Sequence, residues 1–307
     1  MLCIISTQKH LKIVVVTAVV KNAQVLKLKK MPKNIIEIKN LSHSYGQKVI
    51  YQNLNLSIKE GAVYGILGKN GVGKSTLINI LMGYLKPKGG ECLIFGEPSH
   101  NLSTEVKKDI ALLHEGFVAY DYMSIKDYEA FYAPFYKNWD RSVFYDLVDL
   151  MKLSHDQKLS TLSFGQKSQV VLGTIFAQNA KLLILDDYSM GLDAGYRRLF
   201  IDYLKDYIKG TNKTILITSH VMGDLVGLID DIAIVQRGGE VYQDSMDNFI
   251  DNFRCYNLGD QEICETKVHR IEEYKGDRKL YTFEHVDELE ELQTDFEDKF
   301  LGFVGKY

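Results

Sequence analysis

Short apolar runs alternate with amphipathic stretches along most of the chain. The runs are rich in branched side chains, as is typical of strands that are buried on both faces. Such strands are expected at residues 35–39, 54–58, 62–67, 92–95, 110–114, 182–185, 214–217 and 232–235. Apolar residues with helical spacing occupy residues 124–152 and 163–179, for instance Phe144, Leu147, Val148 and Met151. The pattern predicts an α/β domain in which right-handed crossovers join parallel strands.

A different pattern begins after residue 250. Residues 267–271 and 279–283 are predicted to be a strand pair joined through a turn at residues 275–277, and an acidic stretch, Val286–Phe296, is predicted to be helical. We therefore predict a main domain over residues 34–250 and a small α+β appendage over residues 251–307. A charge run of this kind is usually a solvated face, and the alternative is a small regulatory or dimerising module.

Residues 1–33 follow neither pattern. An apolar run, Ile13–Val20, has lysines on both sides. It is consistent with a signal peptide, with an additional edge strand, or with a true start at Met31. We favour the start at Met31 and expect residues 1–33 to be an N-terminal extension outside the fold.

Composition narrows the class of protein. A hydrophobic content of 46% supports a full core, and a net charge of −3 gives no electrostatic case for nucleic acid as a partner. The four cysteines are scattered and form no C-x-x-C pair, which argues against a zinc site and against a disulfide framework. No apolar run approaches the ~18 residues that a membrane helix needs.

The strongest chemical signal is the stretch Gly68–Thr76, which reads G-K-N-G-V-G-K-S-T between a predicted strand and a predicted helix. Glycines let successive backbone N–H groups point at a phosphate, and the start of the helix adds further N–H donors. Lys74 is expected to reach the β- and γ-phosphates and Ser75 to ligate Mg²⁺. The residues expected to bind a nucleoside triphosphate are Gly68, Asn70, Gly71, Gly73, Lys74, Ser75 and Thr76.

A second signal is a buried strand that ends in two carboxylates, Asp186 and Asp187. The carboxyl ends of parallel strands share one edge of the sheet, and the phosphate loop also lies at that edge. Asp186 is the candidate ligand for Mg²⁺, and Asp187 is the candidate group that orients or deprotonates the attacking water.

Four further stretches carry a family resemblance. Leu162–Gln166 (L-S-F-G-Q) resembles the L-S-G-G-Q signature of ATP-binding-cassette (ABC) ATPases, and residues 191–193 resemble the end of their D-loop. His220 resembles their switch histidine, and Tyr45 corresponds to the aromatic residue that stacks on adenine. Order and spacing match over about residues 34–250.

The resemblance implies a P-loop cassette with a mixed sheet core, an antiparallel β subdomain and a helical subdomain at about residues 116–178. It implies ATP and Mg²⁺ as cofactors and a second cassette as partner, because two cassettes pair head to tail around ATP. Ser163, Gly165 and Gln166 would then face the γ-phosphate of the ATP held by the other cassette. Transmembrane permease subunits would be the second partner, with this chain cytoplasmic and peripheral on the inner face of the cell membrane.

Several positions depart from the family pattern. Phe164 replaces the first signature glycine, and Met190 replaces a serine before the D-loop glycine. Glu115 stands where the family has a glutamine, so the expected metal ligands are Ser75, Asp186 and Glu115. The expected catalytic residues are Asp187, His220 and Glu115.

Asp187 stands where a glutamate is usual. Aspartate is shorter by about 1.5 Å, and a misplacement of about 1 Å can cost on the order of 10²-fold in rate. We therefore expect ATP binding with slow hydrolysis. The first interpretation is the ATPase subunit of an ABC transporter; the alternatives are a nucleotide-gated regulatory subunit with little hydrolysis and a soluble ABC ATPase outside transport.

Aromatic residues are dense between the predicted glutamine-loop position and the signature. Most are expected to form the core of the helical subdomain, and exposed ones often mark a partner groove. We predict that a short helix of the membrane subunit docks near residues 117–123. The residues in question are Phe117, Tyr120, Tyr122, Met123, Phe131, Tyr132, Phe135, Tyr136 and Trp139.

Overall fold

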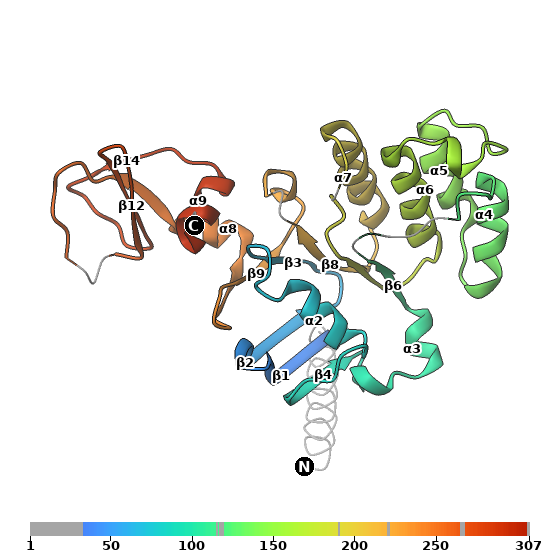
Figure 1. Cartoon of the computed structure of the whole chain (residues 1–307), viewed down its shortest axis with the longest axis horizontal. Helices are drawn as coiled ribbons and strands as arrows, with labels where there is room; N and C mark the ends of the chain where they lie inside the picture. Colours follow the sequence, from blue (N-terminus) through green and yellow to red (C-terminus); the bar gives the residue numbers. More distant parts are fainter. Residues whose placement is uncertain are drawn as a thin grey trace, which may run out of the picture. The chain divides into compact units, whose positions relative to one another are not determined.

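A computed structural model describes residues 33–114, 116, 120–189, 191–219, 222–264 and 268–305. Its centre is a six-stranded sheet with the strand order β10-β9-β3-β8-β7-β6 (Figure 1). Neighbouring strands from β9 to β6 run parallel, whereas β10 pairs antiparallel with β9. The strands are β3 (Val63–Leu67), β6 (Ile110–Leu113), β7 (Leu182–Leu185), β8 (Thr214–Ser219), β9 (Asp231–Val235) and β10 (Val241–Ser245).

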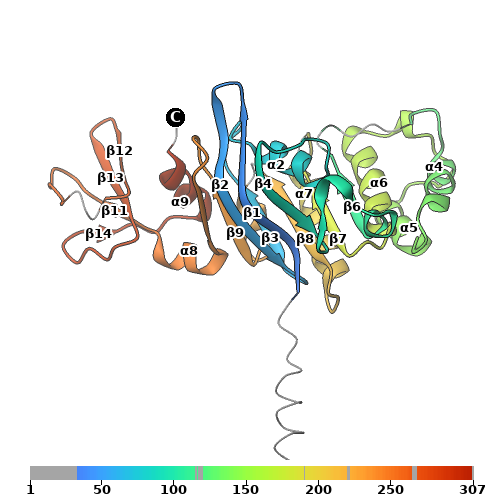
Figure 2. The same ribbon diagram turned by 90° about the horizontal axis from the view of Figure 1, so that it is seen from below.

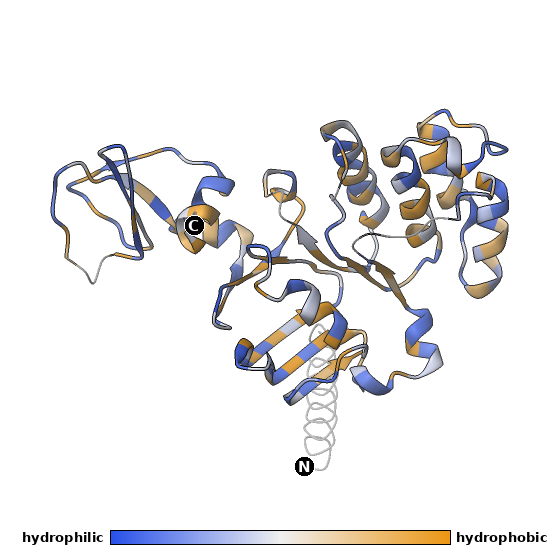
Figure 3. Cartoon of the chain, in the orientation of Figure 1, coloured by the Kyte–Doolittle hydropathy of each residue, from blue (hydrophilic) through white to orange (hydrophobic). Residues whose placement is uncertain are grey.

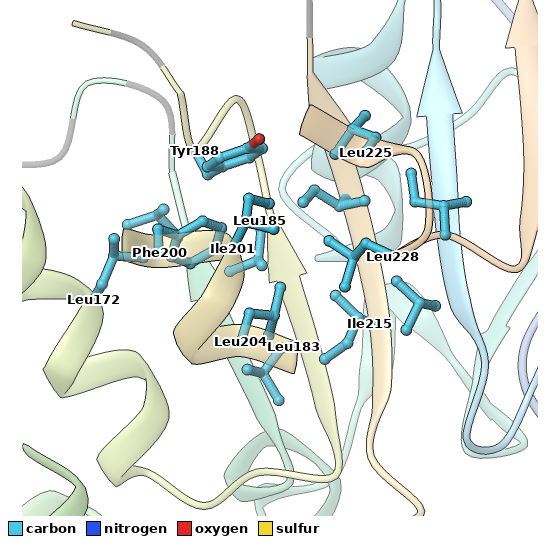
Figure 4. Close-up of a cluster of buried hydrophobic side chains, with 14 of the residues drawn as sticks. Leu172, Leu183, Leu185, Tyr188, Phe200, Ile201, Leu204, Ile215, Leu225 and Leu228 are labelled. Carbon is cyan, nitrogen blue, oxygen red and sulfur yellow. The ribbon is translucent and has the colours of Figure 1, made fainter. Parts of the chain in front are cut away.

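Both faces of this sheet are buried, which explains why its strands are continuous apolar runs. Alternate residues of β7 belong to different cores: Leu183 and Leu185 pack in one cluster, and Leu182 and Ile184 pack in the other. Figure 4 shows Leu183 and Leu185 facing Ile201 and Leu204 of helix α7 (Ala194–Ile208). The sheet therefore separates two hydrophobic layers.

An antiparallel sheet covers one of these layers. Its order is β2-β1-β4-β5, with β1 (Asn34–Tyr45), β2 (Lys48–Lys59), β4 (Gly89–Ile94) and β5 (Glu97–Pro98). Helix α2 (Lys74–Leu81) contributes Leu77, Ile78 and Leu81 to the core that this sheet shares with the central sheet.

The other layer carries most of the remaining helices of the main domain, but the segments at residues 99–101 and 104–108 lie in the same layer as α2, where Leu102 and Val106 pack. Helices α4, α5 and α6 gather together in both ribbon views (Figure 2), and α5 contacts α6 closely. The helical segments are η1 (Ser99–Asn101), α3 (Thr104–Lys108), α4 (Ile125–Tyr132), η2 (Ala133–Phe135), α5 (Arg141–Leu150), η3 (Leu159–Thr161), α6 (Phe164–Ala177), α7 and η4 (Gly223–Leu225). Residues 116–178, the predicted helical subdomain, include α4 to α6.

The C-terminal part is a four-stranded antiparallel sheet with two helices. The sheet order is β12-β13-β11-β14, and the β12–β13 hairpin is strongly hydrophilic (Figure 3). Aromatic side chains join this part to the main core, since the Phe303 ring lies 5.0 Å from the Tyr242 ring of β10 between centroids. The elements are α8 (Met246–Asn252), β11 (Arg254–Asn257), β12 (Arg270–Tyr274), β13 (Asp277–Thr282), β14 (Glu290–Glu291) and α9 (Phe296–Val304).

The fold class predicted from the sequence is confirmed, with local corrections, of which one is that the strand predicted over residues 267–271 is β12 at Arg270–Tyr274. The first strand was expected to end at residue 39, but β1 continues to Tyr45 because Ser44 and Tyr45 pair with Val49 and Lys48. The acidic stretch Val286–Phe296 is not a helix; it contains the short strand β14, and the helix starts only at Phe296. In that stretch Val286 is buried in a small separate cluster, and the charged residues supply no apolar stripe for a helix.

The predictions for residues 1–32 lie outside the described residues. Within the described part of the chain, no helix combines the length and the apolar character that crossing a membrane requires.

Candidate functional site

The carboxyl ends of the parallel strands bring the two chemical signals of the sequence together. A cavity of about 520 Å³ lies between the loop that follows β3 and the carboxylates that follow β7. Tyr45, from the end of β1, also lines it, with His43 edge-on to the Tyr45 ring at 4.9 Å. The cavity is lined by Tyr45, Lys48, Ile50, Asn70, Gly71, Gly73, Lys74, Ser75, Thr76, Asp186, Asp187 and Thr218.

The loop after β3 depends on glycine at Gly73. Its φ is 124°, and a Cβ there would lie 2.5 Å from Cγ2 of Ile50, so a larger residue would be strained and would clash. The Tyr51 hydroxyl donates a hydrogen bond of 2.8 Å to the Gly73 carbonyl. Burial raises the pKa of Tyr51, so this phenol remains a donor at neutral pH. Tyr51 therefore fixes the end of the loop.

Helix α2 begins directly after this glycine, and its first residues, Lys74–Thr76, line the cavity. Gly73 is the N-cap residue, and no side chain caps the helix. The Lys74 ammonium donates hydrogen bonds to the carbonyls of Gly68 at 2.7 Å and Lys69 at 3.1 Å. An uncapped helix start beside a lysine is a suitable site for an anion, because N–H donors and a positive charge converge there.

Positive charge from two other segments adds to the field around this loop. Burial lowers the pKa of Lys69, and the charges of Arg237 and Arg270 lower it further, while Glu272 acts in the opposite direction. Arg237 follows β9, and Arg270 begins β12. The basic surroundings favour a polyanionic ligand such as a triphosphate.

Asp186 and Ser75 form the part of the cavity that suits a divalent cation. Asp186 is only 2% exposed. Its Oδ1 accepts hydrogen bonds from Thr218 Oγ1 at 2.8 Å and from Ser75 Oγ at 3.4 Å. A carboxylate facing a hydroxyl at the start of a helix supplies hard oxygen ligands, which fit Mg²⁺ when phosphate oxygens and water complete its shell.

Asp187 has an unusual backbone conformation. Its φ is 47°, in the left-handed region that aspartate tolerates better than most residues. Its N–H donates to Thr218 Oγ1 at 2.9 Å, and Ser189 Oγ donates to its Oδ1 at 3.1 Å. The carboxylate is therefore held in place from both the backbone and the side chain.

The signature-like residues lie at the start of α6 and do not line this cavity. Ser163 is the N-cap: its Oγ accepts from Gln166 N at 3.2 Å, and Gln166 Oε1 accepts from Ser163 N at 3.0 Å. Gly165 lies against the Tyr196 ring, where a Cβ would not fit. The Phe164 ring covers Gly191, so the bulky residue in the signature-like stretch packs on the D-loop-like segment of the same chain.

Two predicted catalytic residues, Glu115 and His220, lie outside the described residues, as do Met190 and Phe117. Three residues of the cavity were not predicted from the sequence: Lys48, Ile50 and Thr218. A hydroxyl residue at the end of a buried apolar strand was the available signal for Thr218. Nothing in the local pattern distinguishes Lys48 or Ile50.

Comparisons with known proteins indicate the family of this chain. The ABC transporter family model matches residues 51–189. The ATP-binding protein YhcH of Bacillus subtilis is 30% identical over 210 residues, which are 67% of this chain and 68% of that protein. The bacitracin transport ATP-binding protein BcrA of Bacillus licheniformis is 24% identical over 88% of this chain and 97% of its own length. A match to ABC transporter A family member 5 of Dictyostelium discoideum, at 28% identity, covers 84% of this chain but only 16% of that much longer protein.

Solved structures give the same fold. The dimeric ATP-binding cassette MJ0796, bound to ADP and Pi, superposes with a TM-score of 0.59 at 23% identity and covers 69% of this chain and 98% of the cassette.

Proposed function

Because this chain belongs to the ABC transporter family, as one of its ATP-binding proteins, we propose that it binds and hydrolyses ATP to drive a separate membrane permease. The observation that carries the proposal is the convergence of Lys74, Ser75, Asp186 and Asp187 on one cavity. These groups reach it from two strand ends and a helix start, as a triphosphate site requires.

In the proposed site the triphosphate lies against the N–H groups of Gly71–Thr76. Lys74 leaves its loop carbonyls to contact the β- and γ-phosphates, and Tyr45 stacks on adenine. Ser75 and Asp186 hold Mg²⁺, which neutralises charge on the phosphates when it is bound. Gly68 and Asn70 shape the loop without contributing charge.

In the proposed reaction Asp187 orients the attacking water as general base, and its short side chain makes hydrolysis slow. Glu115 and His220 complete the set of proposed catalytic residues from the sequence alone. The left-handed backbone of Asp187 and its contact with Ser189 support a role for this carboxylate at one fixed position.

A second cassette completes the site in this proposal. Ser163, Gly165 and Gln166 of one cassette face the γ-phosphate held by the other, so that ATP joins the pair and hydrolysis releases it. The capped start of α6 supports this role, because the cap fixes the direction of the Ser163 hydroxyl, which still has its own proton to donate.

The permease would contact an aromatic surface on the helical subdomain, formed by Tyr120, Tyr122, Phe131 and Phe135. These side chains are between 38% and 71% exposed. Their rings form a continuous series, with centroid distances of 6.1, 5.5 and 5.7 Å between neighbours. Aromatic residues are enriched at protein interfaces. This surface is therefore proposed to bind the permease subunits, and the binding would hold the chain at the inner face of the membrane.

The function is tested with the purified chain, alone and in vesicles that contain its membrane subunits. We expect ATP binding in both cases, slow phosphate release alone and faster release in the vesicles. Asp187→Asn should retain binding and lose phosphate release by about 10²–10⁴-fold. ATP binding without phosphate release under either condition would instead support the nucleotide-gated subunit.

The permease contact is tested by placing a photo-crosslinking residue at Tyr122 in the assembled complex. The matched control is Tyr274, an aromatic residue of similar exposure on β12. Crosslinks to a membrane subunit should form from position 122 and not from position 274. Equal crosslinking from both positions would remove the support for this surface.

A further inference from the structure

Thr218 occupies a position between the two acidic residues that the nucleotide site needs. It lies in β8, next to β7 on one side and β3 on the other, and its side chain is fully buried. Its Oγ1 donates to Asp186 Oδ1 at 2.8 Å and accepts from Asp187 N at 2.9 Å. One hydroxyl therefore bonds the side chain of one aspartate and the backbone of the next.

The directions of these two hydrogen bonds fix the orientation of the Thr218 hydroxyl. A threonine hydroxyl has one proton, and here it points at Asp186, while a lone pair receives the Asp187 N–H. The Asp187 N–H belongs to a residue with φ of 47°, so the bond helps to hold a backbone conformation that costs energy in most residues. Asp186 in turn accepts from Ser75 across the cavity.

We propose that Thr218 is a positioning residue that sets both carboxylates at once, Asp186 toward the Mg²⁺ position and Asp187 toward the attacking water. The proposal rests on the proposed function above. Because a single hydroxyl controls both groups, loss of that hydroxyl disturbs metal affinity and turnover together, while nucleotide contacts with the phosphate loop remain intact.

The chain contains a matched control on the same strand. Thr214 is also fully buried in β8, and its Oγ1 accepts a backbone N–H from Gly61 at 2.9 Å. Thr214 starts the strand, whereas the cavity lies beyond its other end. Thr214→Val removes a comparable buried hydroxyl and its hydrogen bond without touching either carboxylate.

The experiment compares Thr218→Val, Thr218→Ser and Thr214→Val in the full chain. ATP affinity is measured at increasing Mg²⁺ and with the metal chelated, phosphate release is resolved into kcat and KM, and hydrogen exchange is followed at the Asp187 amide. Thr218→Val should weaken Mg²⁺ affinity in the ATP complex by about 10-fold, since a hydrogen bond to a charged group is lost. It should also lower kcat, speed exchange at Asp187 and leave metal-free ATP affinity within about 2-fold.

Thr218→Ser keeps the hydroxyl and should restore all three properties to within about 3-fold of the original chain. Thr214→Val should lower thermal stability without changing Mg²⁺ affinity or Asp187 exchange. The inference is overturned if Thr218→Val matches the original chain, or if Thr218→Ser is as impaired as Thr218→Val, because then packing and not the hydroxyl matters. An original chain that binds no ATP would overturn the proposed function itself, and the inference with it.

Discussion

The two helix starts that are proposed to contact nucleotide, one in this cassette and one across to the second cassette, are built in different ways. Helix α2 begins at Lys74 with no capping side chain. It follows Gly73, a position whose positive φ favours glycine. Helix α6 begins after Ser163 with a complete capping box, in which Ser163 and Gln166 satisfy each other's backbone N–H groups. The first start offers backbone donors, and the second offers a side-chain hydroxyl in a fixed orientation.

The difference indicates how substitutions should act at each start. Backbone donors at α2 are provided by the shape of the loop, so most side-chain changes there matter only if they alter that shape or remove Lys74. At α6 the donor is a side chain, and its loss should affect the contact with the second cassette but leave binding within one cassette intact. Three substitutions test this difference between the two helix starts, and the first has the largest expected effect.

Lys74→Ala removes the only charge that α2 contributes within its first turn. We expect ATP affinity and phosphate release both to collapse, because the β- and γ-phosphates lose their point charge. Titration with a fluorescent ATP analogue and a phosphate-release assay measure the two effects. Lys108→Ala, on the surface helix α3, should change neither. ATP-dependent turnover that survives Lys74→Ala would contradict the assignment of the whole site.

Ser163→Ala should weaken ATP-dependent dimerisation by about 10-fold, since the hydroxyl donor to the partner's γ-phosphate is lost. It should also cost about 1 kcal/mol of stability through loss of the cap. Ser124→Ala is the matched control, because Ser124 caps α4 with the same kind of capping box. Sedimentation with ATP and thermal unfolding separate the effects. If both variants dimerise equally well, Ser163 serves only as a cap.

Tyr51→Phe removes the hydroxyl that fixes Gly73 and should weaken ATP affinity by roughly 3-fold to 10-fold, the value of one buried hydrogen bond. Tyr207→Phe removes a bond of the same length, 2.8 Å, to the carbonyl of Phe176, far from the loop. Both variants should lose similar stability, and only Tyr51→Phe should lose ATP affinity by calorimetry. An equal ATP affinity in the two would mean that the loop holds its shape without Tyr51.

Much of the main domain was predictable because its strands are buried on both faces and therefore read as unbroken apolar runs. Where burial is one-sided, the pattern of apolar residues was weaker. The first strand was predicted to end at residue 39, because the end of β1 is polar and is held by pairing with β2. The acidic stretch before α9 was mistaken for a helix because charge density alone does not show whether an apolar stripe exists.

The candidate site also combines residues that the sequence predicts with a feature that it does not. Lys74, Ser75 and Asp186 were predicted from spacing to lie together, and they line one cavity, since the strand–loop–helix order determines where they lie. The left-handed backbone of Asp187 was not foreseen, because φ at an aspartate leaves no mark on the sequence. It qualifies the argument from side-chain length: the reach of Asp187 depends on a backbone conformation that the comparison with glutamate did not include.

The aromatic contacts between the C-terminal part and the main core affect synthesis of the chain. Phe303 of α9 packs against Tyr242 and Phe249, which precede it by more than fifty positions. A ribosome that has added residue 250 has therefore made every strand of the central sheet, but not yet the α9 side chain that packs on Tyr242 and Phe249. The nascent chain presents an exposed aromatic face to chaperones until α9 has emerged, and a premature stop in this interval leaves a nucleotide site on an aggregation-prone product.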